Sequence, residues 1–177
     1  MQQQNICEIG PGLGAITLPV LQQVGAIQAI EIDWDLSKEL LEKCKDVGAL
    51  RLYQTDVLKF DFNVVVNEDL PVRLIGNLPY NISTPLFFDL LQYFNFIEDM
   101  HFILQKEVVD RITAAPGNSE YSRLSVMVQS YYKVENLFYV APCMFSPQPK
   151  VASSFMRLLP NNAAQTGLMS RSSFNKV

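Results

Sequence analysis

Short apolar runs alternate with helical patterns along this chain, and no other feature limits its possible folds as strongly. The alternation predicts strands at residues 5–10, 26–33, 50–55, 71–77 and 99–105, and helices at 14–24, 35–45, 83–94, 106–115 and 122–132. Two further β-rich runs, 134–140 and 151–159, close the pattern on either side of a proline-rich connection. Strands that alternate with helices are typical of a doubly wound α/β sheet. We therefore expect a mostly parallel sheet of seven strands with a terminal antiparallel hairpin.

One helix start has an apparent sequence signal. In "STPLFFDLLQYF", Ser83 or Thr84 can cap a helix, and Pro85 suits the first turn. The stretch "GNLPYNIST", which leads into this helix start, is then interpreted as a loop.

Composition limits the class of protein. The 177 residues are 49% hydrophobic and 18% charged, which indicates one folded domain, and no apolar run approaches a membrane span. Cys7, Cys44 and Cys143 lack metal-ligand spacing, so we expect reduced, packed thiols, no metal and a cytoplasmic protein. The net charge of −4 gives no electrostatic signature of nucleic-acid binding. We expect a monomer with no membrane partner.

A glycine-rich turn follows the first predicted strand. In "EIGPGLGAIT", Gly10, Gly12 and Gly14 permit a tight turn and close approach of a ligand, although an ordinary strand-to-helix turn would look similar. Glu31 ends the second strand, where a carboxylate can bind ribose hydroxyls, and Asp56 follows the third. Open α/β sheets bind ligands at this carboxyl edge, so the three features predict a nucleotide-like ligand.

The spacing separates two such ligands. Gly14 comes two residues after Gly12 rather than three, so the dinucleotide fingerprint is not met. Glu8, just before the turn, would repel a pyrophosphate but attract a sulfonium that carries an ammonium group. Asp56 can accept from an adenine amino group. The pattern favours S-adenosylmethionine.

The "NLPY" stretch follows the fourth strand at the same edge. The Asn77 side-chain oxygen and the Leu78 carbonyl can accept the two hydrogens of an exocyclic amine, which aims the nitrogen lone pair. Pro79 stiffens the turn, and Tyr80 can stack on a flat base. The alternative is a plain proline turn whose tyrosine packs in the core. "FSPQPKV" similarly predicts a stiff connection that carries Phe145 toward the site, with Lys150 near phosphate, or else a plain hairpin loop.

Several motifs in order resemble the KsgA-type adenine dimethyltransferases of small-subunit ribosomal RNA. They are "EIGPGLGAIT", "EID", "TDVLKFDF", "GNLPYNISTP", "LQKEVVDRI", "SRLSVMVQ" and "FSPQPKVASSFMRL". The resemblance implies a Rossmann-like class I S-adenosylmethionine-dependent methyltransferase fold. It also implies N6 dimethylation of two adjacent adenosines near the 3′ end of that RNA, within a small ribosomal subunit or its precursor, during ribosome biogenesis.

The resemblance also assigns roles to individual residues. Gly10, Glu31, Asp56 and Asn77 would contact the cofactor, residues 77–80 would form the adenine site, and Phe145 would be its second wall.

Two parts of the family pattern are not found in this sequence. They are an N-terminal segment with a "GQNFL"-like motif over the cofactor and a basic C-terminal helical domain. We therefore expect residues 1–160 to form the catalytic domain, residues 161–177 to be a remnant of or linker to the helical domain, and cofactor binding to be weakened. Two alternatives stay open: an inactive fragment that folds without turnover, and a related methylase of glutamine amides or DNA adenine. Leu78, in place of the proline typical of those enzymes, favours RNA.

Overall fold

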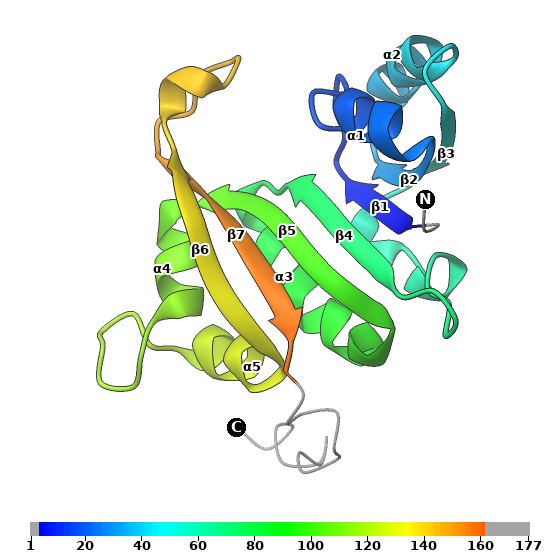
Figure 1. Ribbon diagram of the computed structural model, residues 1–177. Helices are drawn as coiled ribbons and strands as arrows, with labels where there is room; N and C mark the ends of the chain where they lie inside the picture. Colours follow the sequence, from blue (N-terminus) through cyan, green and yellow to red (C-terminus); the bar gives the residue numbers. More distant parts are fainter. Residues whose placement is uncertain (1–3, 162–177) are drawn as a thin grey trace.

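A single seven-stranded sheet organises the computed structural model, which describes residues 4–161. Its order is β3-β2-β1-β4-β5-β7-β6 (Figure 1). The strands are β1 Asn5–Ile9, β2 Ala26–Glu31, β3 Ala49–Gln54, β4 Val72–Asn77, β5 Ile97–Gln105, β6 Tyr132–Val140 and β7 Ser153–Pro160. The α-helices are α1 Thr17–Val24, α2 Trp34–Cys44, α3 Tyr80–Leu90, α4 Lys106–Thr113 and α5 Arg123–Tyr131. The predicted mostly parallel seven-stranded sheet with a terminal antiparallel hairpin is confirmed.

Strand direction determines where the functional loops meet. Strands β1 to β5 pair in parallel, and β7 runs antiparallel to both of its neighbours, β5 and β6. The carboxyl ends of β1 to β4 therefore lie along one edge of the sheet. Because β6 runs parallel to β5, the connection from β6 to β7 reaches the same edge, where it projects beyond the sheet in Figure 1.

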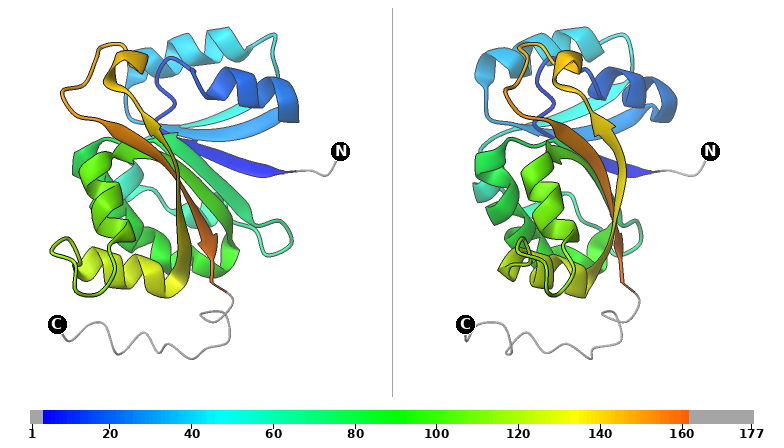
Figure 2. Two further views of the ribbon diagram at one scale, coloured as in Figure 1. Left: turned by 60° about the vertical axis from the view of Figure 1, so that its left-hand side comes forward. Right: turned by 90° about the vertical axis from the view of Figure 1, so that its left-hand side faces the viewer.

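Helices cover the sheet in two groups. Helices α1 and α2 lie by β1, β2 and β3, and α3, α4 and α5 cover the opposite face (Figures 1 and 2). Alternating residues of the central strands feed two cores: Ile6 and Ile75 pack with Leu21 and Leu40, whereas Cys7 and Leu74 belong to the larger core. Burial on both faces explains why these strands are continuously apolar.

Two predictions of detail were wrong. Helix α3 begins at Tyr80 rather than near Ser83, and Pro85 lies inside it. Pro79 is the extended N-cap, and its carbonyl accepts from the Ser83 N–H (3.3 Å), so the helix is already established before Pro85. The "GNLPYNIST" loop is thus only Leu78 and Pro79 between a strand and a helix. Among the cysteines, Cys7 and Cys44 are buried as expected, but Cys143 is exposed because it lies in the projecting β6–β7 connection.

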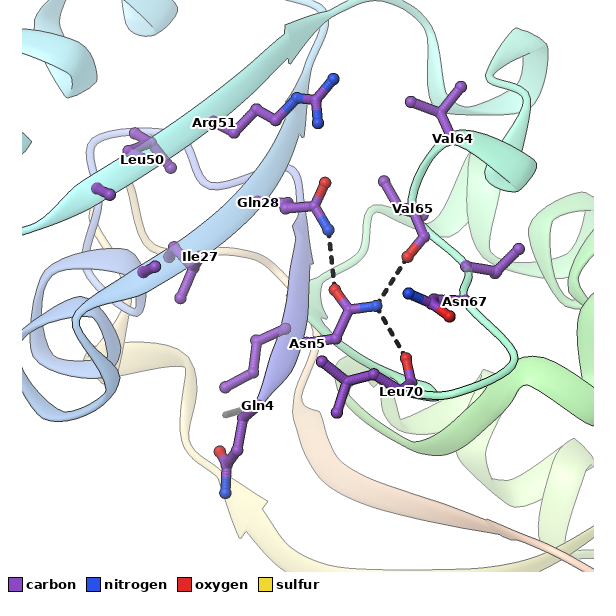
Figure 3. A pocket seen from close by; sticks show the side chains of 14 residues that line it. Gln4, Asn5, Ile27, Gln28, Leu50, Arg51, Val64, Val65, Asn67 and Leu70 are labelled. Carbon is purple, nitrogen blue, oxygen red and sulfur yellow. Dashed lines mark hydrogen bonds between the residues drawn. The ribbon is translucent and has the colours of Figure 1, made fainter. Parts of the chain in front are cut away.

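The amino edge of the sheet carries a pocket of about 460 Å³, which is lined by both polar and apolar side chains. Figure 3 shows Asn5 at its centre, with its amide donating to the carbonyls of Val65 (2.8 Å) and Leu70 (3.2 Å) and accepting from Gln28 (2.8 Å). These bonds anchor the 65–70 connection to β1 and β2. The pocket therefore belongs to the scaffold, at the edge opposite the predicted site.

Within residues 4–161, none of the helices is both long and apolar enough to cross a bilayer. Of the predicted 161–177 linker, residues 162–177 lie outside the described part of the chain.

Candidate active site

The glycine turn between β1 and α1 adopts backbone angles that side chains resist. Gly10, Gly12 and Gly14 have φ values of 68°, 55° and 89°. Gly14 is further limited by packing, because a Cβ there would lie 2.7 Å from Cδ1 of Leu40. The Gly10 N–H donates to the Ile30 carbonyl (2.9 Å), which holds the turn against the end of β2. The predicted turn therefore has a fixed shape before any ligand binds.

Glu31 connects the end of β2 to this turn. One carboxylate oxygen accepts from the Gly12 N–H (3.1 Å) and the other from the Asp33 N–H (3.0 Å). Each oxygen can accept a further bond, so the side chain is both an anchor for the turn and a possible acceptor for ribose hydroxyls. Its predicted contact with the cofactor stays a prediction.

Glu8 lies behind the turn, out of reach of bulk solvent. Its carboxylate accepts from the hydroxyl of Thr17 at the start of α1 (2.6 Å), and both side chains are buried. Burial raises the pKa of Glu8 to about 7, the nearby Glu31 adds to this, and the Thr17 hydrogen bond opposes it. Glu8 is therefore an acid at the end of β1 that changes charge near neutral pH.

We expect Glu8→Gln to remove a pH-dependent cost of folding. The folded pKa of about 7 lies above the ordinary 4.5, so the folded chain binds more protons between these values and stability falls as pH rises through this window. The difference corresponds to about 3 kcal/mol. In denaturant titrations, the free energy of unfolding of Glu8→Gln relative to that of the wild type should therefore rise by about this amount between pH 4 and pH 8. Glu42→Gln, an exposed acid on α2, is the control; a Glu8→Gln curve parallel to the wild type would contradict the assignment.

Asp56 and Asn77 follow β3 and β4 at the same edge. The Asp56 carboxylate caps a short 3₁₀ turn by accepting from the Leu58 N–H (3.0 Å), and one oxygen is left for another donor. Asn77 is exposed, and its backbone carbonyl oxygen would lie 3.9 Å from a Cβ built on Gly10. The glycine turn and Asn77 are therefore adjacent, as their positions at the strand ends predict.

Leu78 and Pro79 are held firmly beside Asn77. The Leu78 N–H donates to the Ile103 carbonyl of β5 (3.0 Å), and its side chain is buried. Tyr80 lies on the first turn of α3 with 47% of its surface exposed, so it is not packed in the core, as the plain-turn alternative would require.

A cavity of about 310 Å³ opens next to this turn. Asn77, Leu78 and Pro79 form one side, and Phe145 from the β6–β7 connection forms another. The remaining lining residues are Gln105, Ser146, Pro147, Pro149, Val151 and Ser153. The structure thus brings together three of the predicted base-site residues and Phe145. Tyr80 and Lys150 are not among the lining residues, although Lys150 is exposed on the same connection.

Sequence reasoning missed three residues of this region. Gln105 and Ser153 line the cavity, and Thr17 binds Glu8. The position of Gln105 at the end of a predicted strand was an available signal. Ser153 could be found only from the pairing of β5 with β7, which brings it opposite Gln105.

The family model and two curated relatives agree on one family of proteins. The family model for ribosomal RNA adenine dimethylase matches residues 1–171. The ribosomal RNA small subunit methyltransferase A of Nitrosococcus oceani is 51% identical over 170 residues, 96% of this chain and 64% of the relative. That of Xanthomonas campestris pv. campestris is 48% identical over 174 residues, 98% of this chain and 66% of the relative.

Solved structures show the same fold. A dimethyladenosine transferase from Plasmodium falciparum has a TM-score of 0.81 and 29% identity, over 95% of this chain and 58% of that one. The 23S rRNA methyltransferase ErmE has a TM-score of 0.77 and 25% identity, over 99% of this chain and 68% of that one.

The alignments cover nearly all of this chain but only part of each relative. The chain spans 64% and 66% of the length of these two curated relatives. The comparisons confirm the resemblance seen in the motifs: the chain belongs to the ribosomal RNA adenine dimethylase family.

Proposed function

We propose that this chain is the catalytic domain of an S-adenosylmethionine-dependent RNA adenine N6-dimethyltransferase. Its proposed substrate is small-subunit ribosomal RNA, within the small subunit or its precursor. The observation that carries the proposal is the cavity that Phe145 lines together with Asn77, Leu78 and Pro79, next to the glycine turn. A base in this cavity would present its amino group next to a cofactor held on that turn.

The residues at the edge suit a cationic cofactor. Glu31 and Asp56 lie at this edge of the sheet, and Glu8 is buried behind the turn. A pyrophosphate would meet acidic groups, whereas the ammonium and sulfonium of S-adenosylmethionine would be attracted to them. Glu31 would bind the ribose hydroxyls, Asp56 the adenine amino group, and the Gly10 turn would allow close approach of the backbone.

Placement of the amine is the proposed main source of catalysis. The Asn77 side-chain oxygen and the Leu78 carbonyl would accept the two N6 hydrogens, so that the nitrogen lone pair points at the methyl group. S-adenosylmethionine, when bound, supplies a methyl group on an excellent leaving group. The N–C bond would form as the S–C bond breaks, and the extra proton on the nitrogen would pass to solvent while Asn77 and Leu78 hold the amine. Among the described lining residues there is no carboxylate, histidine or cysteine, which fits a reaction that needs alignment more than a base.

Methyl transfer tests the proposal directly. The wild-type chain, given tritiated S-adenosylmethionine, should label unmethylated small ribosomal subunits and not fully methylated ones. Calorimetric titration with the cofactor in parallel separates an inactive fragment, which would bind without transfer, from a chain that does not bind. Labelling of duplex DNA but not of subunits would favour the DNA-adenine alternative.

Phe145→Ala should weaken use of the RNA substrate. A base stacked on an aromatic side chain gains about 1–3 kcal/mol, so kcat/KM should fall roughly 5- to 150-fold, while cofactor affinity stays unchanged. Met144→Ala is the matched control, because Met144 lies beside Phe145 but is 76% exposed and does not line the cavity. Equal effects of the two substitutions on kcat/KM would contradict a stacking role for Phe145.

A further inference from the structure

Gln105 occupies a position equivalent to that of Asn77, one strand along. Asn77 ends β4 opposite Ile103 of β5, and Gln105 ends β5 two residues later. Side chains two residues apart on a strand point to the same face, so Gln105 points to the face that carries Asn77. Both line the 310 Å³ cavity, and Ser153, which pairs with Gln105 across β5 and β7, lines it as well.

The Gln105 amide has no structural task in the described part of the chain. Two other half-buried glutamines form hydrogen bonds within the fold. Gln28 donates to Asn5 (2.8 Å) and accepts from Tyr53 (2.8 Å). Gln129 donates to the carbonyls of Ile112 (2.7 Å) and Ala114 (2.8 Å). Gln105 precedes α4, yet its side chain does not cap that helix. Within residues 4–161 it has no side-chain hydrogen bond. Its hydrogen-bonding groups are therefore available to a ligand in the cavity that Gln105 lines.

Adenine offers a matching partner. Its amino group is flanked by two ring acceptors, N1 and N7, and a side-chain amide can pair with the amino group and an adjacent ring nitrogen together. Asn77 and Leu78 offer only oxygen acceptors to the amino hydrogens in the proposed geometry. A donor on the neighbouring strand would complete recognition of the base edge, as is usual for bases read outside a duplex.

We infer that Gln105 is a specificity-determining residue, whose Nε2 donates to the ring nitrogen beside the reacting amino group of the target adenine. This rests on the proposed function, because it places adenine in the same cavity. The role is distinct from that of Asn77: Gln105 holds the ring, and Asn77 holds the amine.

Atom-deleted substrates test this role. Subunits carrying adenosine, 1-deazaadenosine or 7-deazaadenosine at the target positions are compared with the wild-type chain, Gln105→Leu and Gln148→Leu. Gln148 lies exposed on the β6–β7 connection, does not line the cavity and is the matched control. One deaza substrate should lower the wild-type kcat/KM about 5- to 150-fold. Gln105→Leu should lose a similar factor on adenosine and show no further loss on that deaza substrate, whereas Gln148→Leu should behave as the wild type.

A binding measurement separates this inference from the proposed activity. In the chain saturated with S-adenosylhomocysteine, the side-chain amide NMR signal of Gln105 should shift on titration with adenosine monophosphate, and less with the critical deaza analogue. If subunits are not methylated but this shift occurs, the proposed activity fails and the Gln105 contact stands. If methylation proceeds with an equal wild-type kcat/KM on adenosine and both deaza substrates, the role of Gln105 is overturned and the proposed function stands. The same conclusion follows if Gln105→Leu loses as much kcat/KM on the deaza substrate as the wild type does. The role is also overturned if neither methylation nor a shift is seen.

Discussion

Asn77→Ala is expected to lower kcat for methyl transfer to small ribosomal subunits by about 100-fold or more, the usual loss when one pre-organised polar partner of a transition state is removed. The side chain is exposed at the end of β4, so its truncation leaves no cavity and should not unfold the chain. The loss should appear in kcat rather than in KM for RNA, because the proposed contact aims the amine instead of anchoring the substrate.

Asn81→Ala provides the matched control. Asn81 is an exposed asparagine on the first turns of α3, four residues after Asn77. It should retain the wild-type rate. Single-turnover assays with saturating tritiated S-adenosylmethionine measure the step directly, and calorimetry with the cofactor checks that both variants still bind it. Label incorporation by Asn77→Ala at the wild-type rate would remove the proposed role of this side chain.

Gly76→Ala is expected to destabilise the fold by about 3 kcal/mol or more, near the upper end of overpacking effects in well-packed cores. A Cβ on Gly76 would overlap the carbonyl oxygen of Ile9 and lie 3.3 Å from its carbonyl carbon. Both atoms belong to the backbone of β1, which pairs with β4 at this point, so no flexible side chain can move aside. The strands would have to separate directly beneath Asn77.

Gly117→Ala distinguishes this clash from a general cost of losing glycine. Gly117 lies between α4 and α5 with φ of 90°, but a Cβ there meets no atom within 4 Å. Its cost should be about 1–2 kcal/mol, from the left-handed backbone alone. Urea titration of both variants gives the comparison. Equal losses would show that β1 and β4 can separate slightly at little cost.

The sequence predicted the features that depend on local pattern. Alternating strands and helices, the glycine turn, and the positions of Glu31 and Asn77 at strand ends all follow from short-range periodicity and turn residues. The start of α3 was misplaced because Ser83, Thr84 and Pro85 form an acceptable helix start by local rules, whereas the structure begins the helix from the extended Pro79.

Features that depend on pairing could not be predicted. A terminal hairpin was expected, but no local signal places β7 rather than β6 beside β5. That placement brings Ser153 opposite Gln105 and places Phe145 in the lining of the cavity that Asn77 also lines. Likewise, the buried contact of Thr17 with Glu8 joins residues on two sides of a turn, and the shape of that turn depends on contacts with the end of β2 and with α2.

The insertion of β7 between β5 and β6 has a consequence for synthesis on the ribosome. The turn and acids proposed to bind the cofactor are complete once β4 has emerged, whereas Phe145 cannot be positioned until β7 has entered the sheet. A nascent chain that has emerged from the ribosome only as far as α5 would thus contain the edge formed by β1 to β4, but not Phe145, which lines the base cavity. Because β7 is the last strand in the sequence and lies between β5 and β6, the base cavity would be completed after the edge that is proposed to bind the cofactor.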